Sequence, residues 1–218
     1  MNIEKNVAKI RERINLAAKK GGRDPNDVRL IAVTKTVGIE EFRELLACGV
    51  RDVGENRLQV ALPKLTALAE EELSWHFIGT LQSNKAKKVT ANFSCIHSVD
   101  NWELILEIDR TARSAEKKIQ VLLEVNVSGE ASKHGLGPET VPDLVRRCRE
   151  LKNVELVGLM TMAPLTDDQE KVRPYFRSLR KLADRSALKE CSMGMSDDFE
   201  VAVEEGSTMV RIGRALFR

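Results

Sequence analysis

The stretch Leu30-Ile31-Ala32-Val33-Thr34-Lys35 is a short, apolar, β-branched run, which predicts a buried strand, and it ends on a lysine. Buried strands more often give way to residues that leave a sheet readily, such as Gly, Asn or Pro. Lysine is costly to bury, and a partly desolvated lysine amine is a nucleophile that forms Schiff bases with carbonyls. Lys35 is therefore a candidate for covalent chemistry, and the alternative is a side chain that extends from the strand end into water.

The composition excludes several classes of protein. The chain has 218 residues, of which 42% are hydrophobic and 31% charged, enough for one large domain or two small ones. Its net charge of +2 gives no electrostatic case for binding nucleic acid or a membrane surface. The first residues are charged and helix-patterned, unlike a signal peptide, and no apolar run approaches the length of a membrane span. We expect a cytoplasmic protein.

The cysteines and histidines suggest no metal centre. Cys48, Cys95, Cys148 and Cys191 are far apart and show no paired spacing, which predicts free thiols, mostly in the core, in a reducing compartment. The sequence also shows no His/Cys ligand spacing, no carboxylate pair and no Ser-His-Asp arrangement. We therefore expect neither a metal site nor a familiar hydrolytic apparatus.

Short apolar segments alternate with helical patterns along the whole chain, without a linker or repeat. The eight predicted strands are residues 30–35, 50–53, 75–78, 94–99, 121–127, 154–160, 191–195 and 208–212. The predicted helices are 2–20, 39–46, 58–69, 85–89, 101–118, 139–151, 167–182 and 196–205, with a short terminal helix opened by Gly213. Strict alternation implies a parallel sheet covered by helices. The fold expected is a TIM-type (β/α)8 barrel at the small end of its range, and a doubly wound open sheet is the alternative.

Polar residues gather at the predicted C-terminal ends of the strands, where a barrel builds its site. These ends carry Lys35, Asn56, Thr80, His97, Asn126, Met160, Ser192 to Ser196, Arg211 and Gly213. The last two strand ends are typical of a phosphate site, which barrels place on the loops after strands seven and eight. Ser196 belongs to this site or simply caps the next helix. Asp197 and Asp198 would repel a phosphate unless they point away from it.

Other conspicuous residues are expected to be structural. His76 is predicted to pack its outer face under a helix, and Tyr175 to pack within helix 167–182. The basic cluster Lys85, Lys87 and Lys88 predicts a solvated helix face, and a second anion site is the alternative. Core positions near the barrel mouth are expected for Met160, Met162, Met193 and Met195.

Taken in order, these motifs resemble the YggS/PROSC-type pyridoxal phosphate homeostasis proteins, which are similar to the barrel half of bacterial alanine racemase standing alone. The segments that carry the resemblance are Ala32-Val33-Thr34-Lys35, Gly54-Glu55-Asn56, residues 75–85, residues 96–100, residues 124–128, residues 158–162, residues 192–198 and Val210-Arg211-Ile212-Gly213-Arg214. They span the whole chain, and together they are highly specific. Only Arg218, where the family more often has glycine, departs from the pattern, and it lies at the end of the sequence.

The resemblance implies one barrel domain over residues 1–218, like the alanine racemase N-terminal domain and without a C-terminal β domain. It implies that Lys35 holds pyridoxal 5′-phosphate (PLP) as a Schiff base, that Arg211 faces the pyridine nitrogen, and that the 192–196 turn and Gly213 hold the phosphate. The cofactor-binding residues implied are Lys35, Asn56, Ser192, Met193, Ser196, Arg211 and Gly213. Such a site suits the cofactor, because a phosphate needs amides and hydroxyls and the ring needs a fixed electronic partner.

The expected function is to bind PLP and to buffer or deliver it, without efficient catalysis, and no catalytic residue is predicted. The alternative is a PLP enzyme such as an amino-acid racemase. An arginine beside the ring nitrogen keeps that nitrogen unprotonated and weakens the electron sink. In the racemase fold a second base comes from an additional domain and a partner subunit, whereas this sequence ends at Phe217-Arg218.

A third hypothesis, an aldolase-type lysine without a cofactor, leaves the phosphate-like features of the last strands unexplained. In a closed barrel strand eight neighbours strand one, so one small molecule can reach both Lys35 and the phosphate site. The expected partners are PLP and apo PLP-dependent enzymes as recipients, and the expected oligomeric state is a monomer.

Overall fold

Eight parallel strands close into a ring in the computed structural model, which describes residues 2–130 and 133–218. The strands are β1 (Arg29–Val33), β2 (Asp52–Glu55), β3 (Ser74–Phe77), β4 (Cys95–Val99), β5 (Ile119–Glu124), β6 (Val154–Met160), β7 (Glu190–Ser192) and β8 (Met209–Ile212). Each pairs with the next along the chain, and β8 pairs back to β1. The predicted barrel is therefore confirmed, and the open doubly wound sheet is excluded.

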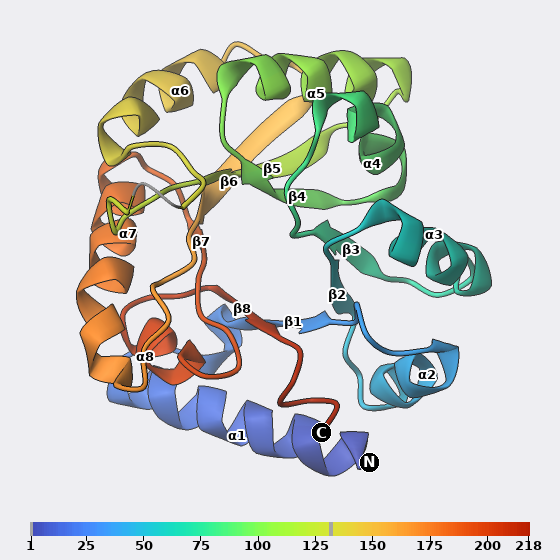
Figure 1. Cartoon of the computed structure of the whole chain (residues 1–218), viewed down its shortest axis with the longest axis vertical. Helices are drawn as coiled ribbons and strands as arrows, with labels where there is room; N and C mark the ends of the chain where they lie inside the picture. The colour runs from blue at the N-terminus through green and yellow to red at the C-terminus, as the bar shows by residue number, and fades with distance from the viewer. Residues whose placement is uncertain (1, 131–132) are drawn as a thin grey trace.

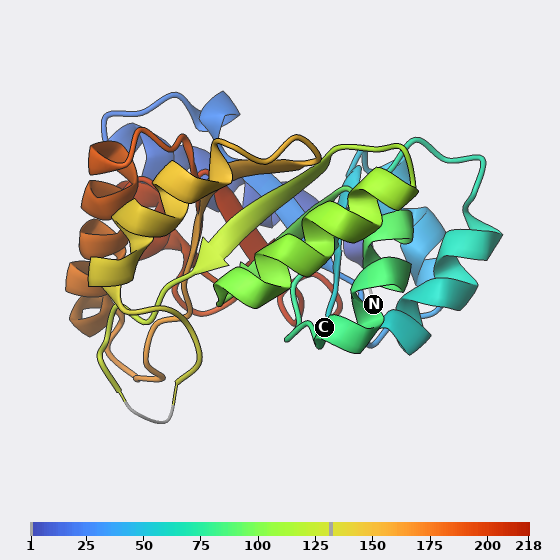
Figure 2. The same cartoon turned by 90° about the horizontal axis from the view of Figure 1, so that it is seen from above.

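Helices form an outer layer around the strands (Figure 1, Figure 2). They are α1 (Ile3–Lys20), α2 (Ile39–Ala47), α3 (Leu58–Ala67), α4 (Ala86–Asn92), α5 (Trp102–Ser114), α6 (Val141–Cys148), α7 (Arg173–Arg185) and α8 (Phe199–Glu204). The described residues form no helix that is both long enough and apolar enough to cross a membrane. Figure 2 shows the loops after β5 and β6 projecting together from one side of the barrel, where the C-terminal strand ends open.

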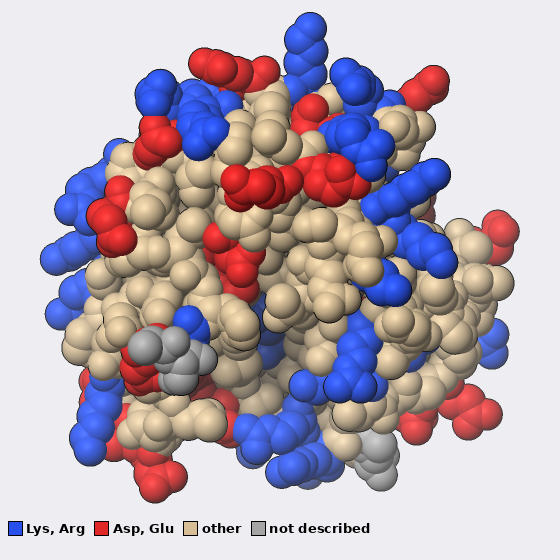
Figure 3. All heavy atoms as spheres, turned by 45° about the horizontal axis from the view of Figure 1, so that its top comes forward, with Lys and Arg blue, Asp and Glu red and all other residues tan. Residues whose placement is uncertain are grey.

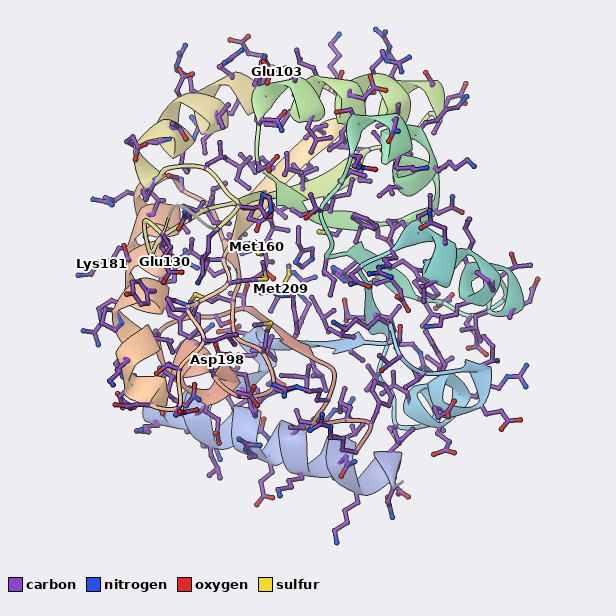
Figure 4. The ribbon with its side chains drawn as sticks, in the orientation of Figure 1. Glu103, Glu130, Met160, Lys181, Asp198 and Met209 are labelled. Carbon is purple, nitrogen blue, oxygen red and sulfur yellow. The ribbon has the colours of Figure 1, made fainter. Side chains whose placement is uncertain are left out.

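Side chains alternate between the inside of the barrel and the layer under the helices. Ile31, Cys95, Leu122, Met160 and Met209 form a small interior cluster, and all five are at most 2% exposed. Figure 4 shows Met160 and Met209 within the ring of strands. The opposite face of the strands joins the helices in a larger core, which is what alternation along a barrel strand requires.

Helix α1 shows why the sequence-based boundaries succeed. Asn2 caps it by accepting a hydrogen bond from the Lys5 N–H at 2.8 Å, and its apolar residues, spaced three or four apart, are buried. Gly21 ends the helix and lies against the backbone of Glu204, so a Cβ there would come 2.9 Å from the Glu204 carbonyl oxygen. This contact ties α1 to the end of α8.

Several predicted boundaries near the barrel mouth are wrong, and the predicted strands 30–35, 121–127 and 191–195 end early, at Val33, Glu124 and Ser192. The second strand is β2 (Asp52–Glu55) rather than 50–53, because pairing with β3 begins at Asp52. Helix α8 begins at Phe199 rather than 196, because Asp198 is its N-cap residue. Gly213 opens a turn rather than a helix, and the turn is closed by a hydrogen bond from the Leu216 N–H to the Gly213 carbonyl.

The surface and the thiols agree with the composition. In Figure 3, Lys and Arg side chains are interspersed with Asp and Glu over the visible face, as expected for a net charge of +2. All four cysteines are free; Cys95, Cys148 and Cys191 are buried and Cys48 is half-buried. Burial raises the pKa of the Cys95 and Cys191 thiols to about 12, so both stay protonated at neutral pH.

Candidate functional site

The ends of β1 and β8 meet at one seam of the barrel mouth. Ala32 pairs with Ile212, and a Cβ built on Gly213 would lie 3.4 Å from Val33. Lys35 follows two residues after Val33, in the turn by which the chain leaves β1. The predicted lysine and the predicted Gly213 turn are therefore neighbours across this seam.

Lys35 is exposed, which differs from the partial desolvation expected from the sequence. The reason is local: β1 ends at Val33, and Lys35 already belongs to the following turn. The residue before it is fully buried, since Thr34 is 0% exposed. Lys35 is therefore solvent-exposed, and the residue before it, Thr34, is fixed in the protein interior.

Thr34 is held by a buried ion pair between the barrel and α3. The Glu55 Oε1 atom accepts hydrogen bonds from the Thr34 hydroxyl at 2.7 Å and from the Lys64 ammonium at 2.6 Å. The same ammonium donates to the Thr34 carbonyl. Lys64 and Glu55 are 6% and 0% exposed, and within the described residues the Glu55 Oε2 atom has no partner. The signal for this pair was in the sequence, because an acid at a buried strand end needs a cation.

Arg211 lies below the mouth, at 5% exposure, and points along the barrel interior from β8. Its Nη1 donates to the Ser192 Oγ at 2.5 Å and its Nη2 to the Thr161 carbonyl at 3.0 Å. Burial lowers its pKa to about 10, against the opposing effects of Asp198 and Glu124. The guanidinium is therefore charged at neutral pH and fixed in place.

Ser192 and Met193 do not present their side chains to the mouth. Ser192 is 0% exposed, and its hydroxyl is shared between Arg211 and the Nδ1 of His97, the latter at 2.8 Å. The Met193 side chain is buried in the outer core. The Met193 backbone is also committed, since its N–H donates to the Met209 carbonyl at 3.2 Å and its carbonyl accepts the Ser207 hydroxyl at 2.7 Å, and Ser192 can act only through Arg211.

The 193–198 turn carries the two acids that could oppose an anion. Asp197 pairs with Arg214 on the surface, and Asp198 turns back so that its Oδ1 accepts the Met195 N–H at 2.6 Å. Burial raises the pKa of the Asp198 carboxyl, and Figure 4 shows this residue close to α8. The structure thus answers the objection for Asp197, which faces solvent, and only partly for Asp198.

Ser196 connects this turn to the one after β8 instead of capping α8. Its hydroxyl accepts a long hydrogen bond, at 3.4 Å, from the Ala215 N–H. In the part of the chain that the structure describes, the backbone N–H groups of Ser196 and Gly213 have no acceptor. Two uncommitted amides therefore lie in turns that are joined to each other and next to the Lys35 seam, which suits an anion.

The remaining predicted mouth residues divide into two groups. Asn56 is half-buried, and the backbone of Gly79 packs so closely on it that a Cβ at Gly79 would lie 2.1 Å from the Asn56 carbonyl oxygen. Asn126 is committed to its own loop, where its side chain donates to the Glu130 carbonyl at 2.9 Å and accepts the Gly129 N–H at 3.1 Å. Asn56 therefore remains near the mouth, and Asn126 is structural.

Several secondary expectations can also be compared with the structure. Tyr175 packs against the core from α7, as predicted. Met160 is interior, but Met162 is 46% exposed and is not a core residue. Lys87 and Lys88 are exposed and Lys85 is half-buried, beside a small cavity of about 120 Å³ that Asn56 also lines.

His76 points into the barrel, so its prediction as an outward residue is wrong. Trp75 and Phe77 pack in the outer core, and strand alternation then turns His76 inward. Its Nδ1 lies 2.9 Å from the Nε2 of His97, and its Nε2 lies 3.0 Å from the Oδ1 of Asp52. The aromatic pair on either side was the signal that could have placed it.

These histidines and Cys95 form a group of three possible metal ligands whose ligand atoms lie within 4.8 Å of one another. Direct hydrogen bonds already occupy both ring nitrogens of each histidine. The Cys95 thiol, whose pKa burial raises to about 12, is a poor ligand. Hydrogen bonding accounts for this cluster without a metal.

Comparison with known proteins places this arrangement in context. The family described as "Alanine racemase, N-terminal domain" matches residues 3–218. A protein of Aquifex aeolicus named "Pyridoxal phosphate homeostasis protein" is 45% identical over 100% of this chain and 98% of its own length.

Two solved structures share the architecture over the whole chain. An unknown protein from Bifidobacterium adolescentis is 38% identical, with a TM-score of 0.93 over 99% of this chain and 94% of its own. PipY of Synechococcus elongatus, solved with PLP bound, is 34% identical, with a TM-score of 0.86 over 99% of this chain and all of its own. Both similarities exceed what fold alone requires.

Proposed function

This chain belongs to the alanine racemase N-terminal domain family and, within it, to the pyridoxal phosphate homeostasis proteins; on that premise we propose that it binds PLP at the barrel mouth and holds it on Lys35. The observation that carries the proposal is the β1–β8 seam, where Gly213 lies against Val33 and an exposed lysine follows. The PLP-bound relative PipY supports the choice of ligand.

Lys35 supplies the covalent attachment. Its amine attacks the aldehyde carbon of the cofactor, a carbon–nitrogen double bond forms, and the aldehyde oxygen leaves as water. The reaction is reversible, as storage and delivery require. The buried Thr34 beneath Lys35 fixes the direction of approach, because its hydroxyl and its carbonyl are both held.

The anionic end of the cofactor is expected at the two linked turns. The free N–H groups of Ser196 and Gly213 are donors without acceptors among the described residues, so a phosphate would satisfy them. The Met193 side chain takes no part, and Asn56 is expected beside the ring.

Arg211 is expected to face the pyridine nitrogen. Its guanidinium is buried and charged, and one N–H of each Nη is already bonded to Ser192 and to Thr161, so the N–H groups that are left can only donate to that nitrogen. The nitrogen is then held unprotonated. The bound cofactor supplies an electron-withdrawing ring for carbanion chemistry, and this pairing weakens it.

We therefore propose a protein that buffers or delivers PLP, as one barrel domain and as a monomer, without efficient turnover. The homeostasis names of its relatives favour this over a racemase. Tyr175, the single tyrosine, lies in α7 on the outside of the barrel and is not available as a second base. Apo PLP-dependent enzymes are the proposed recipients.

The test is a titration of the purified protein with PLP, followed by absorption spectroscopy, for the wild type and for Lys35→Ala. The wild type should develop the visible band of lysine-bound cofactor, and the variant should not. L- and D-alanine are then added separately, and chirality is followed over time. Rapid interconversion of the two enantiomers by the wild type would favour the racemase alternative.

A further inference from the structure

A row of polar side chains crosses the barrel interior from the N-terminal end of β2 to Arg211. Asp52 lies 3.0 Å from His76, His76 lies 2.9 Å from His97, and His97 lies 2.8 Å from Ser192. Ser192 lies 2.5 Å from Arg211. His76, His97 and Ser192 are at most 2% exposed, whereas the Asp52 side chain is 25% exposed. We call these five residues the interior chain.

The two ends of the interior chain fix the direction of every hydrogen bond in it. Arg211 can only donate, so the Ser192 oxygen accepts from it and the Ser192 hydroxyl is free to donate to the Nδ1 of His97. A carboxylate can only accept, so the Nε2 of His76 carries a hydrogen toward Asp52. The Nδ1 of His76 then accepts from the Nε2 of His97.

This single pattern satisfies every donor and acceptor, with both histidines neutral and both in the Nε2–H form. Burial, then the nearby His76 and Arg211, lower the pKa of His97 well below its ordinary value. A proton added to His76 would place two N–H groups face to face and would force His97 to reverse. The serine hydroxyl would then lose its acceptor, and its hold on Arg211 would change.

Charges around the two ends agree with this pattern. Glu124 of β5 and Asp198 before α8 act on Arg211 from the mouth side, and Arg29 of β1 acts on His97 from below. At the opposite end, Asp52 lines a cavity of about 370 Å³ with Arg11 and Arg51. The interior chain therefore runs from a partly exposed carboxylate to a buried guanidinium.

We propose that Asp52, His76, His97 and Ser192 are positioning residues that hold Arg211 from behind, against the ring nitrogen of the bound cofactor. The inference rests on the proposed function for the role of the cofactor, but the hydrogen-bond pattern does not depend on it. Among the five residues of the interior chain, only Arg211 contacts the cofactor. The rest set its direction and keep its outward N–H groups aimed at the mouth.

The pattern is tested first without the cofactor, by nitrogen-detected NMR of the imidazole rings. The sequence has three histidines, and His134 is exposed, so the two interior rings can be assigned by substitution. Both His76 and His97 should be neutral Nε2–H tautomers at pH 7. An Nδ1–H tautomer at either position, or a charged ring, would overturn the proposal.

The effect on cofactor binding is tested with three variants. His97→Phe removes the hydrogen bonds in the middle of the interior chain, and Asp52→Asn keeps an acceptor for His76. Cys95→Ala alters a neighbouring buried side chain of the same interior without removing any hydrogen bond of the interior chain. His97→Phe should raise the PLP dissociation constant about tenfold, because Ser192 loses the partner that holds it in place for its hydrogen bond with the charged Arg211. It should also shift the pH profile of the visible band.

Asp52→Asn should retain most of the binding, and Cys95→Ala should match the wild type in affinity and pH profile. If His97→Phe and Cys95→Ala have the same affinity and pH profile, the interior chain does not position Arg211. If the wild type gives no band at all, the proposed function fails while the tautomer measurement still decides the hydrogen-bond pattern. Circular dichroism identifies a His97→Phe protein that has not folded, and Asp52→Ala, a milder break at the solvated end, then replaces it, with a smaller loss of affinity expected.

Discussion

The barrel holds its two predicted cofactor contacts by opposite means. On the outer face of the sheet, Thr34 beneath Lys35 is braced by the buried ion pair of Glu55 and Lys64. On the inner face, Arg211 is held by the neutral Ser192, His97 and His76, and this row ends at the partly exposed Asp52 carboxylate. We call Thr34, Glu55 and Lys64 the brace; these three residues bond only to one another in this network, whereas the interior chain crosses the barrel.

The difference shows how each network should respond to damage. Removing one member of a buried ion pair leaves the other charge unpaired in the protein interior, which lowers the free energy of unfolding strongly. Removing a neutral histidine leaves only unsatisfied hydrogen-bonding groups, which cost less. The brace should therefore govern stability, and the interior chain should govern how Arg211 is presented.

The largest expected effect comes from breaking the brace. Lys64→Met should lower the free energy of unfolding by about 3–5 kcal/mol, because Glu55 is left charged and buried. Urea unfolding followed by circular dichroism measures this loss. The double variant Glu55→Gln with Lys64→Met should recover much of it.

The exposed pair of Glu107 and Arg110 supplies a matched control for the brace. Arg110→Met should leave the unfolding midpoint nearly unchanged, since this pair is solvated. If Lys64→Met is as mild as Arg110→Met, the ion pair does not support the residue before Lys35.

A smaller loss is expected where the mouth is most tightly packed. A Cβ at Gly79 would lie 2.1 Å from the Asn56 carbonyl, and backbone cannot yield as a flexible side chain does. Gly79→Ala should cost about 1–3 kcal/mol in unfolding free energy and should weaken PLP binding by displacing Asn56. Gly22→Ala is a useful comparison, since it has space but a φ of +68°. It should lower stability without changing PLP affinity.

The interior chain should make the free energy of unfolding depend on pH, through His97. Because the pKa of His97 is lowered well below 6.5, the unfolded chain takes up a proton at this residue that the folded chain refuses. The stability from neutral His97 is present above pH 6.5 and is lost as pH falls below it, by up to about 1.4 kcal/mol per pH unit.

Urea unfolding at a series of pH values from neutral to mildly acidic gives the slope. His97→Phe should flatten that slope, and His134→Phe, at an exposed position, should not. An unchanged slope in His97→Phe would show that His97 is not the buried group that resists protonation.

The smallest effect concerns the thiols. Cys95 lies beside the interior chain, and burial raises its pKa to about 12, as it does for Cys191. Both should resist a thiol reagent in the folded protein, whereas the half-buried Cys48 should react first. Labelling followed by mass spectrometry checks the order, and early modification of Cys95 would mean that the barrel interior opens.

The sequence predicts the barrel well, because the alternation of apolar segments with helical patterns determines the order of strands and helices even where individual boundaries are wrong. It predicts less of the site, because local patterns do not state which side of a strand faces inward. His76 was placed on the wrong face, although Trp75 and Phe77 flank it. Ser192 was expected at the phosphate, and its partners on other strands instead draw it inward.

Exposure and long-range pairing were also beyond local reasoning. Lys35 was expected to be partly desolvated, but it is exposed because β1 ends two residues earlier. An acid at a buried strand end indicates that some cation lies near Glu55, but the local pattern does not identify Lys64 as that cation. Contacts between a helix and a strand end depend on packing that no single segment encodes.

The most direct test of the account is to identify the lysine that carries the cofactor. The protein is incubated with PLP, reduced with borohydride, digested and mapped by mass spectrometry. A phosphopyridoxyl adduct is expected on Lys35 and none on Lys64, whose ammonium is committed to Glu55 and to the Thr34 carbonyl. An adduct confined to Lys64 or to surface lysines, with Lys35 unmodified, would contradict it.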